Sequence, residues 1–127
     1  MRIKEEDKEE IKKSAYFLLQ RGFSVQEDYD TVMFTDGQID IIANYERYEN
    51  ISSLSIHYKK ENETFNIGWT AFVRANLKTD CTKRLENILI LMDYLQKNFE
   101  AVSDYDYCKE SQNLVKRFVE DNLNRQL

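Results

Sequence analysis

Polar side chains in the middle of the chain have the types and the spacing that a metal site would use. Asp36, Gln38 and Asp40 alternate, with Gly37 between the first two, as ligands do at the start of a calcium-binding loop. The isoleucines at positions 39, 41 and 42 offer no further side-chain oxygen, and no glutamate stands at the twelfth position. An Asp-Gly pair between alternating residues is a strong signal of a tight hairpin. We therefore predict a hairpin with Asp36-Gly37 at its tip rather than a calcium site.

A second arrangement would suit a metal-dependent nuclease. Asp40 followed by His57-Tyr58-Lys59 is distantly similar to the D…ExK pattern of restriction-endonuclease-like enzymes, with a histidine in place of the second acid. The alternation of a strand would put His57 and Lys59 on one face. However, residues 23–63 hold nine carboxylates and three bases, a local charge of −6 that repels a phosphate backbone. An enzyme using Asp40, His57 and Lys59 stays as the alternative function, and we do not expect the chain to bind nucleic acid.

Other catalytic sets are incomplete. His57 is the only histidine, and neither Cys81 nor Cys108 has a flanking motif that would mark a nucleophile with an oriented base. One histidine and two separated cysteines do not make a standard zinc site, so two reduced thiols are the expectation. We predict no enzymatic activity, no metal and no cofactor.

The N-terminal segment argues against export. MRIKEEDKEE is charged from its second residue and lacks the apolar centre of a signal peptide. The longest apolar run, residues 88–92, is far shorter than the roughly 20 residues that cross a bilayer. We expect a cytoplasmic protein that does not bind membranes.

Helical spacing of apolar residues flanks a central region of strand-like alternation. Helices are expected at 4–21, at 79–99 and at 104–124, the last burying Tyr107, Leu114, Val115, Phe118 and Leu123. A weak strand at 23–27 is followed by strands whose apolar members are Val32 and Phe34; Ile39, Ile41, Ala43 and Tyr45; Leu54, Ile56 and Tyr58; and Phe65, Ile67 and Trp69. The last set is interpreted as the core face of a central strand.

The grouping of these elements predicts the fold class. Strands that follow one another, with helices before and after them, are typical of an antiparallel sheet with helices on one face. We predict a single α+β domain over residues 1–127, with four to five antiparallel strands, an N-terminal helix and two C-terminal helices packed mainly on one face. The opposite face would hold Met33, Asp40, Ile42, Asn44, His57 and Lys59. Met33 and Ile42 on that face would suit a docking surface or a homodimer contact.

Two stretches interleave tyrosine with acid, NYERYEN at 44–50 and SDYDYCKE at 103–110. Tyrosine supplies contact area at little entropic cost, and carboxylates pair with arginine across interfaces. A loop and a capped helix start would explain the acids equally well, but not the tyrosines. With the acids near residue 28, these stretches predict a surface that binds a basic protein. The expected partner-binding residues are Glu27, Asp28, Asp30, Tyr45, Glu46, Tyr48, Glu49, Tyr105 and Asp106.

Residues 33–74 resemble small immunity proteins of bacterial polymorphic-toxin systems. The similar parts are the "IDI…YERY" strand exit, the alternating "LSIHYKK" and the "F-IGW-A-VR" segment. The resemblance implies a cytoplasmic protein without chemistry of its own, which binds and blocks a cognate toxin, often a basic nuclease. A phage-encoded or regulatory interaction protein would need the same surface and would differ only in its target.

Overall fold

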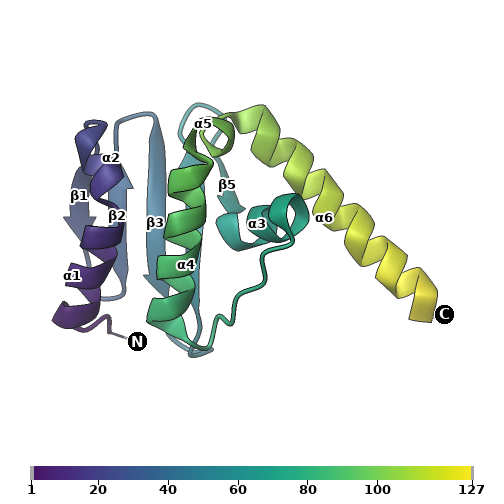
Figure 1. The fold of residues 1–127 in the computed structure, drawn as a ribbon, viewed down its shortest axis with the longest axis horizontal. Helices are drawn as coiled ribbons and strands as arrows, with labels where there is room; N and C mark the ends of the chain where they lie inside the picture. Colours follow the sequence, from purple (N-terminus) through teal and green to yellow (C-terminus); the bar gives the residue numbers. More distant parts are fainter. Residues whose placement is uncertain (1, 127) are drawn as a thin grey trace.

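Over residues 2–126, five strands lie between two N-terminal and four C-terminal helices, the grouping of elements that the sequence pattern predicts. The structure is a computed structural model that describes the backbone of residues 2–126 and the side chains of residues 2–124 (Figure 1). The strands are β1 (Ser24–Glu27), β2 (Thr31–Thr35), β3 (Ile39–Tyr45), β4 (Ser52–Tyr58) and β5 (Glu63–Asn66). The helices are α1 (Glu5–Ser14), α2 (Tyr16–Gln20), α3 (Ile67–Ala75), α4 (Arg84–Lys97), α5 (Phe99–Val102) and α6 (Tyr105–Gln126).

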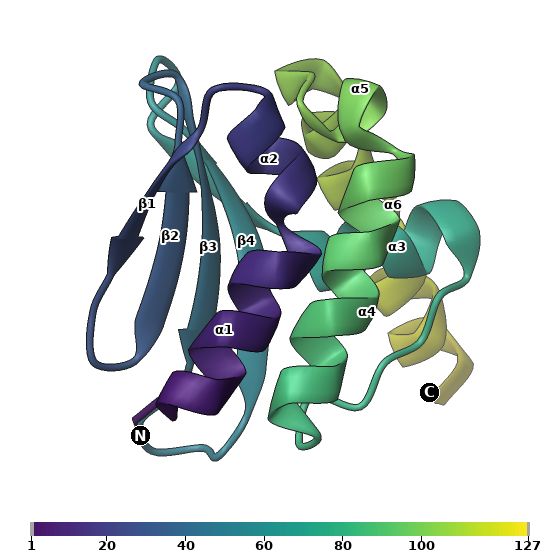
Figure 2. The ribbon, with the colours of Figure 1, turned by 60° about the vertical axis from the view of Figure 1, so that its left-hand side comes forward.

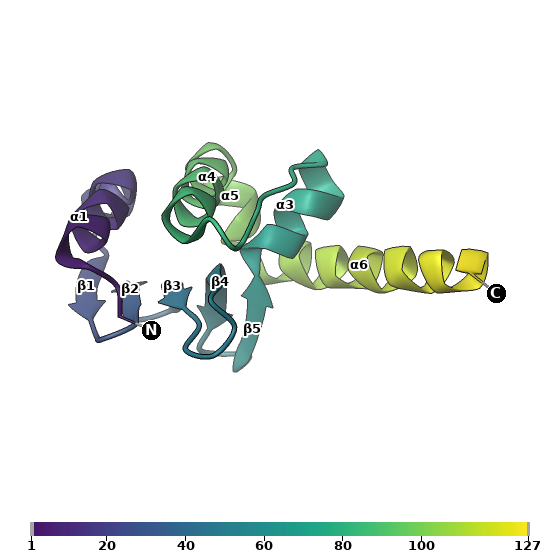
Figure 3. The same ribbon diagram turned by 90° about the horizontal axis from the view of Figure 1, so that it is seen from below.

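The sheet is an antiparallel meander in which each strand pairs with the next along the chain. Alternation in β2, β3 and β4 sends one set of apolar side chains under the helices: Val32, Phe34, Ile41, Ala43, Leu54 and Ile56, all fully or almost fully buried. Helices α1, α2 and α4 lie against this face, and the other face of the sheet carries no helix (Figures 2 and 3). The predicted α+β fold, with helices on one face, is confirmed.

The first helix is interrupted at Ala15. The residue adopts φ −100° and ψ 14°, and the Ser14 hydroxyl donates to the Ile11 carbonyl at 2.6 Å. Serine that hydrogen-bonds back to the preceding turn weakens and bends a helix. The two short helices still keep Ile11, Ala15 and Leu18 on the buried side, as the apolar spacing predicts.

The segment after residue 66 is where the predicted strand is wrong. Strand β5 lies at the sheet edge and ends at Asn66, whose Oδ1 accepts a hydrogen bond from the Gly68 amide at 2.7 Å and so caps α3. A Cβ at position 68 would come within 2.9 Å of that oxygen, so glycine is what allows the tight cap. From Ile67 onward the buried residues follow helical spacing, and Trp69 turns outward with 47% of its surface exposed.

Helix α6 extends past the edge of the sheet (Figures 1 and 3). Its 22 residues make it about 33 Å long, and only its first half packs against the body, where Cys108 and Ser111 are buried. Of its predicted buried residues, Phe118 and Leu123 are exposed, because α3 is too short to cover the second half. Over residues 2–126, no helix has both the length and the apolar character needed to cross a membrane.

Candidate functional site

The acidic loops meet at one end of the sheet. The β1–β2 and β3–β4 connections leave the same end of the meander, and the Tyr45 amide donates to the Asp30 carbonyl at 2.9 Å. This brings Asp28 and Asp30 into one region with the loop that carries Glu46, Tyr48 and Glu49, a set that sequence patterning also groups. All five are exposed or half-buried, and Tyr48 is almost wholly in solvent.

Tyr45 belongs to the core rather than to the surface. It is 2% exposed, and its hydroxyl donates to Asp7 at 2.9 Å. The Arg84 guanidinium lies 4.9 Å from the centre of its ring. Burial and the bond to Asp7 raise the pKa of the Tyr45 hydroxyl, which therefore stays protonated. The structure removes Tyr45 from the partner-binding set, because alternation along β3 turns its ring toward the helices.

Glu27 also lies at this end, next to Asp28, but it pairs with Lys12 of α1 at 3.2 Å. Two other predicted residues stand apart from this end. Tyr105 lies at the start of α6, at the opposite end of the sheet, and its hydroxyl donates to Glu63 at 2.5 Å. This hydrogen bond, more than burial, raises the pKa of Tyr105 to about 12. Asp106 is exposed next to it. In each acidic stretch, one tyrosine, Tyr45 or Tyr105, makes an internal hydrogen bond to a carboxylate.

A groove of about 660 Å³ opens beside the β3–β4 loop. Glu46 and Glu49 line it from that loop, while Trp69, Phe72 and Leu77 supply much of its apolar wall. Clefts of several hundred cubic ångströms with apolar walls and few polar groups are the usual form of binding sites. The predicted residues Glu46 and Glu49 therefore lie at the edge of an apolar cleft rather than on a flat acidic surface.

The groove exists because β5 is short. The β4–β5 ladder ends at the pair of Ser55 and Asn66, so the first three residues of β4 have no neighbouring strand on that side. The loop before α4 takes over the hydrogen bonds: the Ser52 amide donates to the Cys81 carbonyl at 3.0 Å. The Asn87 side-chain amide donates to the Ser52 carbonyl at 3.1 Å and to its hydroxyl at 2.9 Å. The backbone N–H and C=O of Ser52 on the open edge are thereby paired without a strand that would fill the space.

Aromatic rings form an array that continues from this wall. The Trp69 and Phe72 rings meet edge to face with centres 5.9 Å apart, and Phe72 meets Phe118 of α6 at 5.0 Å. Phe118, which also lines the groove, is 42% exposed. Exposed aromatic side chains in a cleft are typical anchors of protein interfaces.

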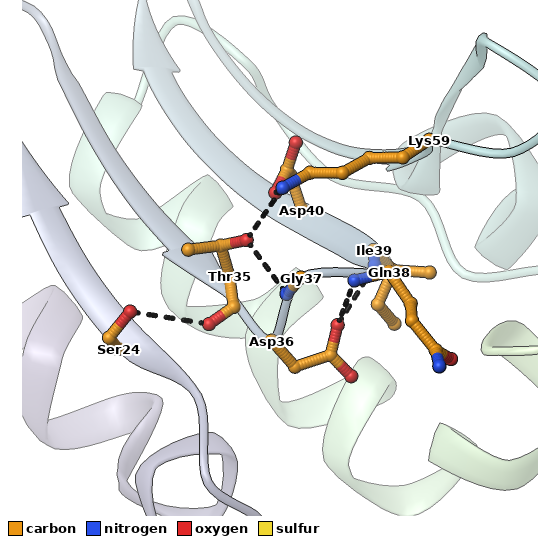
Figure 4. Close-up of polar contacts among 8 residues, drawn as sticks. All are labelled: Ser24, Thr35, Asp36, Gly37, Gln38, Ile39, Asp40 and Lys59. Carbon is orange, nitrogen blue, oxygen red and sulfur yellow. Dashed lines mark hydrogen bonds and ion pairs between the residues drawn. The ribbon is translucent and has the colours of Figure 1, made fainter.

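The open face of the sheet holds the residues proposed for metal chemistry, and two of them, Asp40 and Lys59, form an ion pair (Figure 4). Asp40 lies opposite His57 in the β3–β4 ladder, and Lys59 Nζ lies 3.5 Å from Asp40 Oδ1. Lys59 also donates to the Thr35 hydroxyl at 3.3 Å, and His57 Nδ1 is 2.8 Å from the Thr64 hydroxyl. The Asp40 carboxylate is thereby paired with an ammonium group. Among the residues that the structure describes, no three His, Cys, Asp or Glu side chains gather as metal ligands would.

The turn beside this cluster confirms the predicted hairpin. Asp36 Oδ1 accepts from the amides of Gln38 and Ile39, both at 2.9 Å, and Gly37 has a φ of +91° (Figure 4). The carboxylate that resembled the first calcium ligand therefore closes its own turn, a common use of aspartate at such positions.

No protein-family model, curated protein or solved structure matches this chain.

Several groove residues were not predicted from the sequence. Trp69 was assigned to the core, Phe72 was not singled out, and Phe118 was expected to be buried. The signal that could have found Trp69 is Asn66 followed by helical spacing, because asparagine is a preferred N-cap. Phe118 carries no comparable signal, because its exposure depends on how far α3 extends along α6.

Proposed function

We propose that this chain is a non-enzymatic binding module that holds a basic protein in the groove between the β3–β4 loop and α3. The observation that carries the proposal is an apolar cleft with exposed Trp69 on its wall and two carboxylates, Glu46 and Glu49, at its edge. An aromatic side chain contributes affinity because its apolar surface is buried when the partner binds. Charged residues at the edge of the groove raise the association rate with a partner of opposite charge. A basic segment with an apolar side chain fits both features.

The resemblance to immunity proteins supports the same site. Its three similar stretches are the exit of β3, most of strand β4 and the β5–α3 junction, and each contributes lining residues to the groove: Glu46, Ser55, Asn66, Trp69 and Phe72. We therefore propose that the protein acts in the cytoplasm as an immunity protein that neutralises a basic toxin. A regulatory target would use the groove in the same way, and the identity of the partner separates the two roles.

The test is capture of the partner by the tagged protein from its native strain at low and at high salt, with identification by mass spectrometry. The proposal expects a basic protein encoded beside this chain, whose toxicity in a host cell is suppressed on co-expression. A variant with Trp69→Ala should weaken the complex about 30-fold or more, as truncation of a central aromatic anchor does. Absence of a specific basic partner at either salt concentration would refute the proposal.

Charge variants localise the contact. Glu46→Gln with Glu49→Gln should reduce affinity about tenfold and flatten its dependence on salt. Asp93→Asn with Glu100→Gln is the matched control, because it makes the same change in net charge at exposed residues that do not line the groove. If both double variants weakened binding equally, overall charge rather than this groove would be responsible.

The two cysteines provide a direct report of the occupied groove. Cys81 is exposed and lines the groove, whereas Cys108 is buried and its pKa is raised by that burial. A thiol reagent should therefore modify Cys81 first. The proposal expects the bound partner to slow this modification, and an unchanged rate in a saturated complex would place the partner elsewhere.

A further inference from the structure

The second half of α6 presents apolar side chains that the other described side chains, within residues 2–124, leave partly exposed. Phe118, Val119 and Leu123 are 42%, 43% and 56% exposed on the part of the helix that extends past the sheet (Figure 1). Burying the apolar surface that these side chains still expose would be favourable, so leaving it in water is costly. Exposed clusters of this kind usually mark an interface.

These side chains share one face of the helix. Leu114, Val115, Phe118, Val119 and Leu123 are separated by steps of one, three, four or five residues, which keeps them on a continuous stripe. The stripe begins where α6 packs on α3, with Leu114 and Val115 half-buried, and continues beyond α3 to Leu123. A partner that covers it must therefore lie along α6 and reach the end of α3.

The charges beside the stripe show which partner fits. At about 100° per residue, Lys116 and Glu120 lie along one flank, and Arg117 and Asp121 lie along the other. On each flank a base precedes an acid by four residues, the less favourable order for a pair within one helix. Among the side chains of residues 2–124, none of the four has an opposite charge within 4 Å.

The same order suits two copies of this helix that run in opposite directions. In an antiparallel pair each flank faces the same flank of the other copy, so a base meets an acid at both ends. With the two-fold axis between residues 118 and 119, Lys116 and Glu120 of the second copy lie on matching flanks, as do Arg117 and its Asp121, and each pair is offset by about 1.5 Å along the helix axis. The apolar residues match at the same levels, since Leu114 lies level with Leu123 of the second copy and Phe118 lies level with its Val119.

We propose that the chain forms a two-fold symmetric dimer through antiparallel packing of the second halves of α6. An isologous interface requires a surface complementary to itself, and this segment has that property in both its charges and its apolar side chains. The end of each α6 then covers α3 of the other copy near Phe72. The dimer would share Phe72 and Phe118 with the wall of the groove, but it uses none of Glu46, Glu49 or Trp69, so the dimer and the proposed function are tested separately.

The test is the molar mass of the full chain, measured by sedimentation over a wide range of concentrations. The dimer predicts twice the monomer mass of 15.2 kDa. Lys116→Glu with Arg117→Glu turns every cross-dimer pair into a repulsion and should weaken dimerisation about a hundredfold. Glu120→Lys with Asp121→Lys should do the same, whereas an equimolar mixture of the two double variants, or all four changes in one chain, should restore the dimer.

These variants change only exposed side chains, so circular dichroism should show the fold intact. A chain that stays monomeric at every concentration would overturn the proposal. A dimer that survives both charge reversals would also overturn it, and would point to the open face of the sheet around Met33 and Ile42. Leu123→Glu distinguishes failure of the dimer from failure of the proposed function. This variant should be monomeric, and binding of the proposed partner should still protect its Cys81.

Discussion

Arg74 of α3 makes several contacts to α6, and the loss of stability on removing them can be worked out from the structure. Arg74 Nε donates to the Ser111 hydroxyl at 2.8 Å, and one terminal nitrogen donates to the Tyr107 carbonyl at 3.3 Å. The same guanidinium lies 4.3 Å from the centre of the Tyr107 ring and 3.4 Å from Glu110. We expect Arg74→Met to destabilise the fold, since methionine keeps the aliphatic stem but no donor.

The hydrogen bonds should dominate this loss. A bond from a charged group to a half-buried acceptor contributes about 1.5–3 kcal/mol. The ion pair to Glu110 contributes little, because that carboxylate is 72% exposed. The Ser111 hydroxyl keeps its own bond to the Tyr107 carbonyl at 2.7 Å, so neither group is left without a partner. We therefore expect about 2 kcal/mol from the lost hydrogen bonds, near the lower end of that range.

Arg21 is a matched control for the remaining interactions. Its guanidinium also lies 4.3 Å from an aromatic centre, that of Phe99, and 3.4 Å from a carboxylate, that of Glu100. The side-chain hydrogen bonds of Arg74 to α6 have no counterpart among the contacts of Arg21 within the described residues. The difference between Arg74→Met and Arg21→Met therefore isolates those bonds.

The assay is equilibrium unfolding by urea, followed by circular dichroism, with thermal unfolding beside it. Because unfolding entropy scales to about 0.27 kcal/mol per kelvin for this length, a loss of 2 kcal/mol lowers Tm by about 7 °C. The expected result is that Arg74→Met loses about 2 kcal/mol more than Arg21→Met. Equal losses in the two variants would refute the idea that hydrogen bonds from Arg74 secure α6.

Three further results are expected. Asn66→Ala should cost about 1 kcal/mol by removing the cap of α3, and Asn66→Asp, which keeps an acceptor, should restore most of the loss in urea unfolding. The hydrogen bond from Tyr105, and to a smaller extent the one from Lys109, lowers the pKa of Glu63 below 4.5 in the folded state. The contact therefore stabilises the fold fully above pH 4.5, and this stabilisation is lost as the pH falls through the lower pKa of the folded state. Tyr105→Phe should accordingly lower Tm at neutral pH and lower it less in strong acid. Magnesium or manganese should leave Tm unchanged, and a metal-induced rise that disappears in Asp40→Ala would instead favour the alternative enzyme.

The sheet could be predicted because its signals are local. Alternation at Val32, Phe34, Ile41 and Leu54 needs only one buried face, and the Asp36 turn uses its own carboxylate. Prediction failed after Asn66, where the spacing of the apolar residues suits both a strand and a helix. The spacing of Phe65, Ile67 and Trp69 suits a strand, but the cap at Asn66 starts a helix after the first of them.

The candidate site could be predicted only in part, for a related reason. Acid-rich loops are visible in the sequence, and Glu46 and Glu49 do lie at the edge of the groove. Which tyrosines are available is a tertiary property: Tyr48 is exposed, whereas Tyr45 bonds to a carboxylate 38 residues away and Tyr105 to one 42 residues away. Long-range partners of this kind leave no trace in a short window of sequence.

The end of β5 is the local event on which both proposed surfaces depend. Because the strand ends at Asn66, one part of the β4 edge stays open and becomes the floor of the groove, while Trp69 is carried outward on α3. The same turn sets the position of α3. Arg74 of α3 then binds the first half of α6 through Ser111, and the second half of α6 extends beyond α3. A longer β5 would close the groove and remove the helix that α6 packs against. The four-residue strand is therefore a condition for the binding surface and for the dimer surface alike.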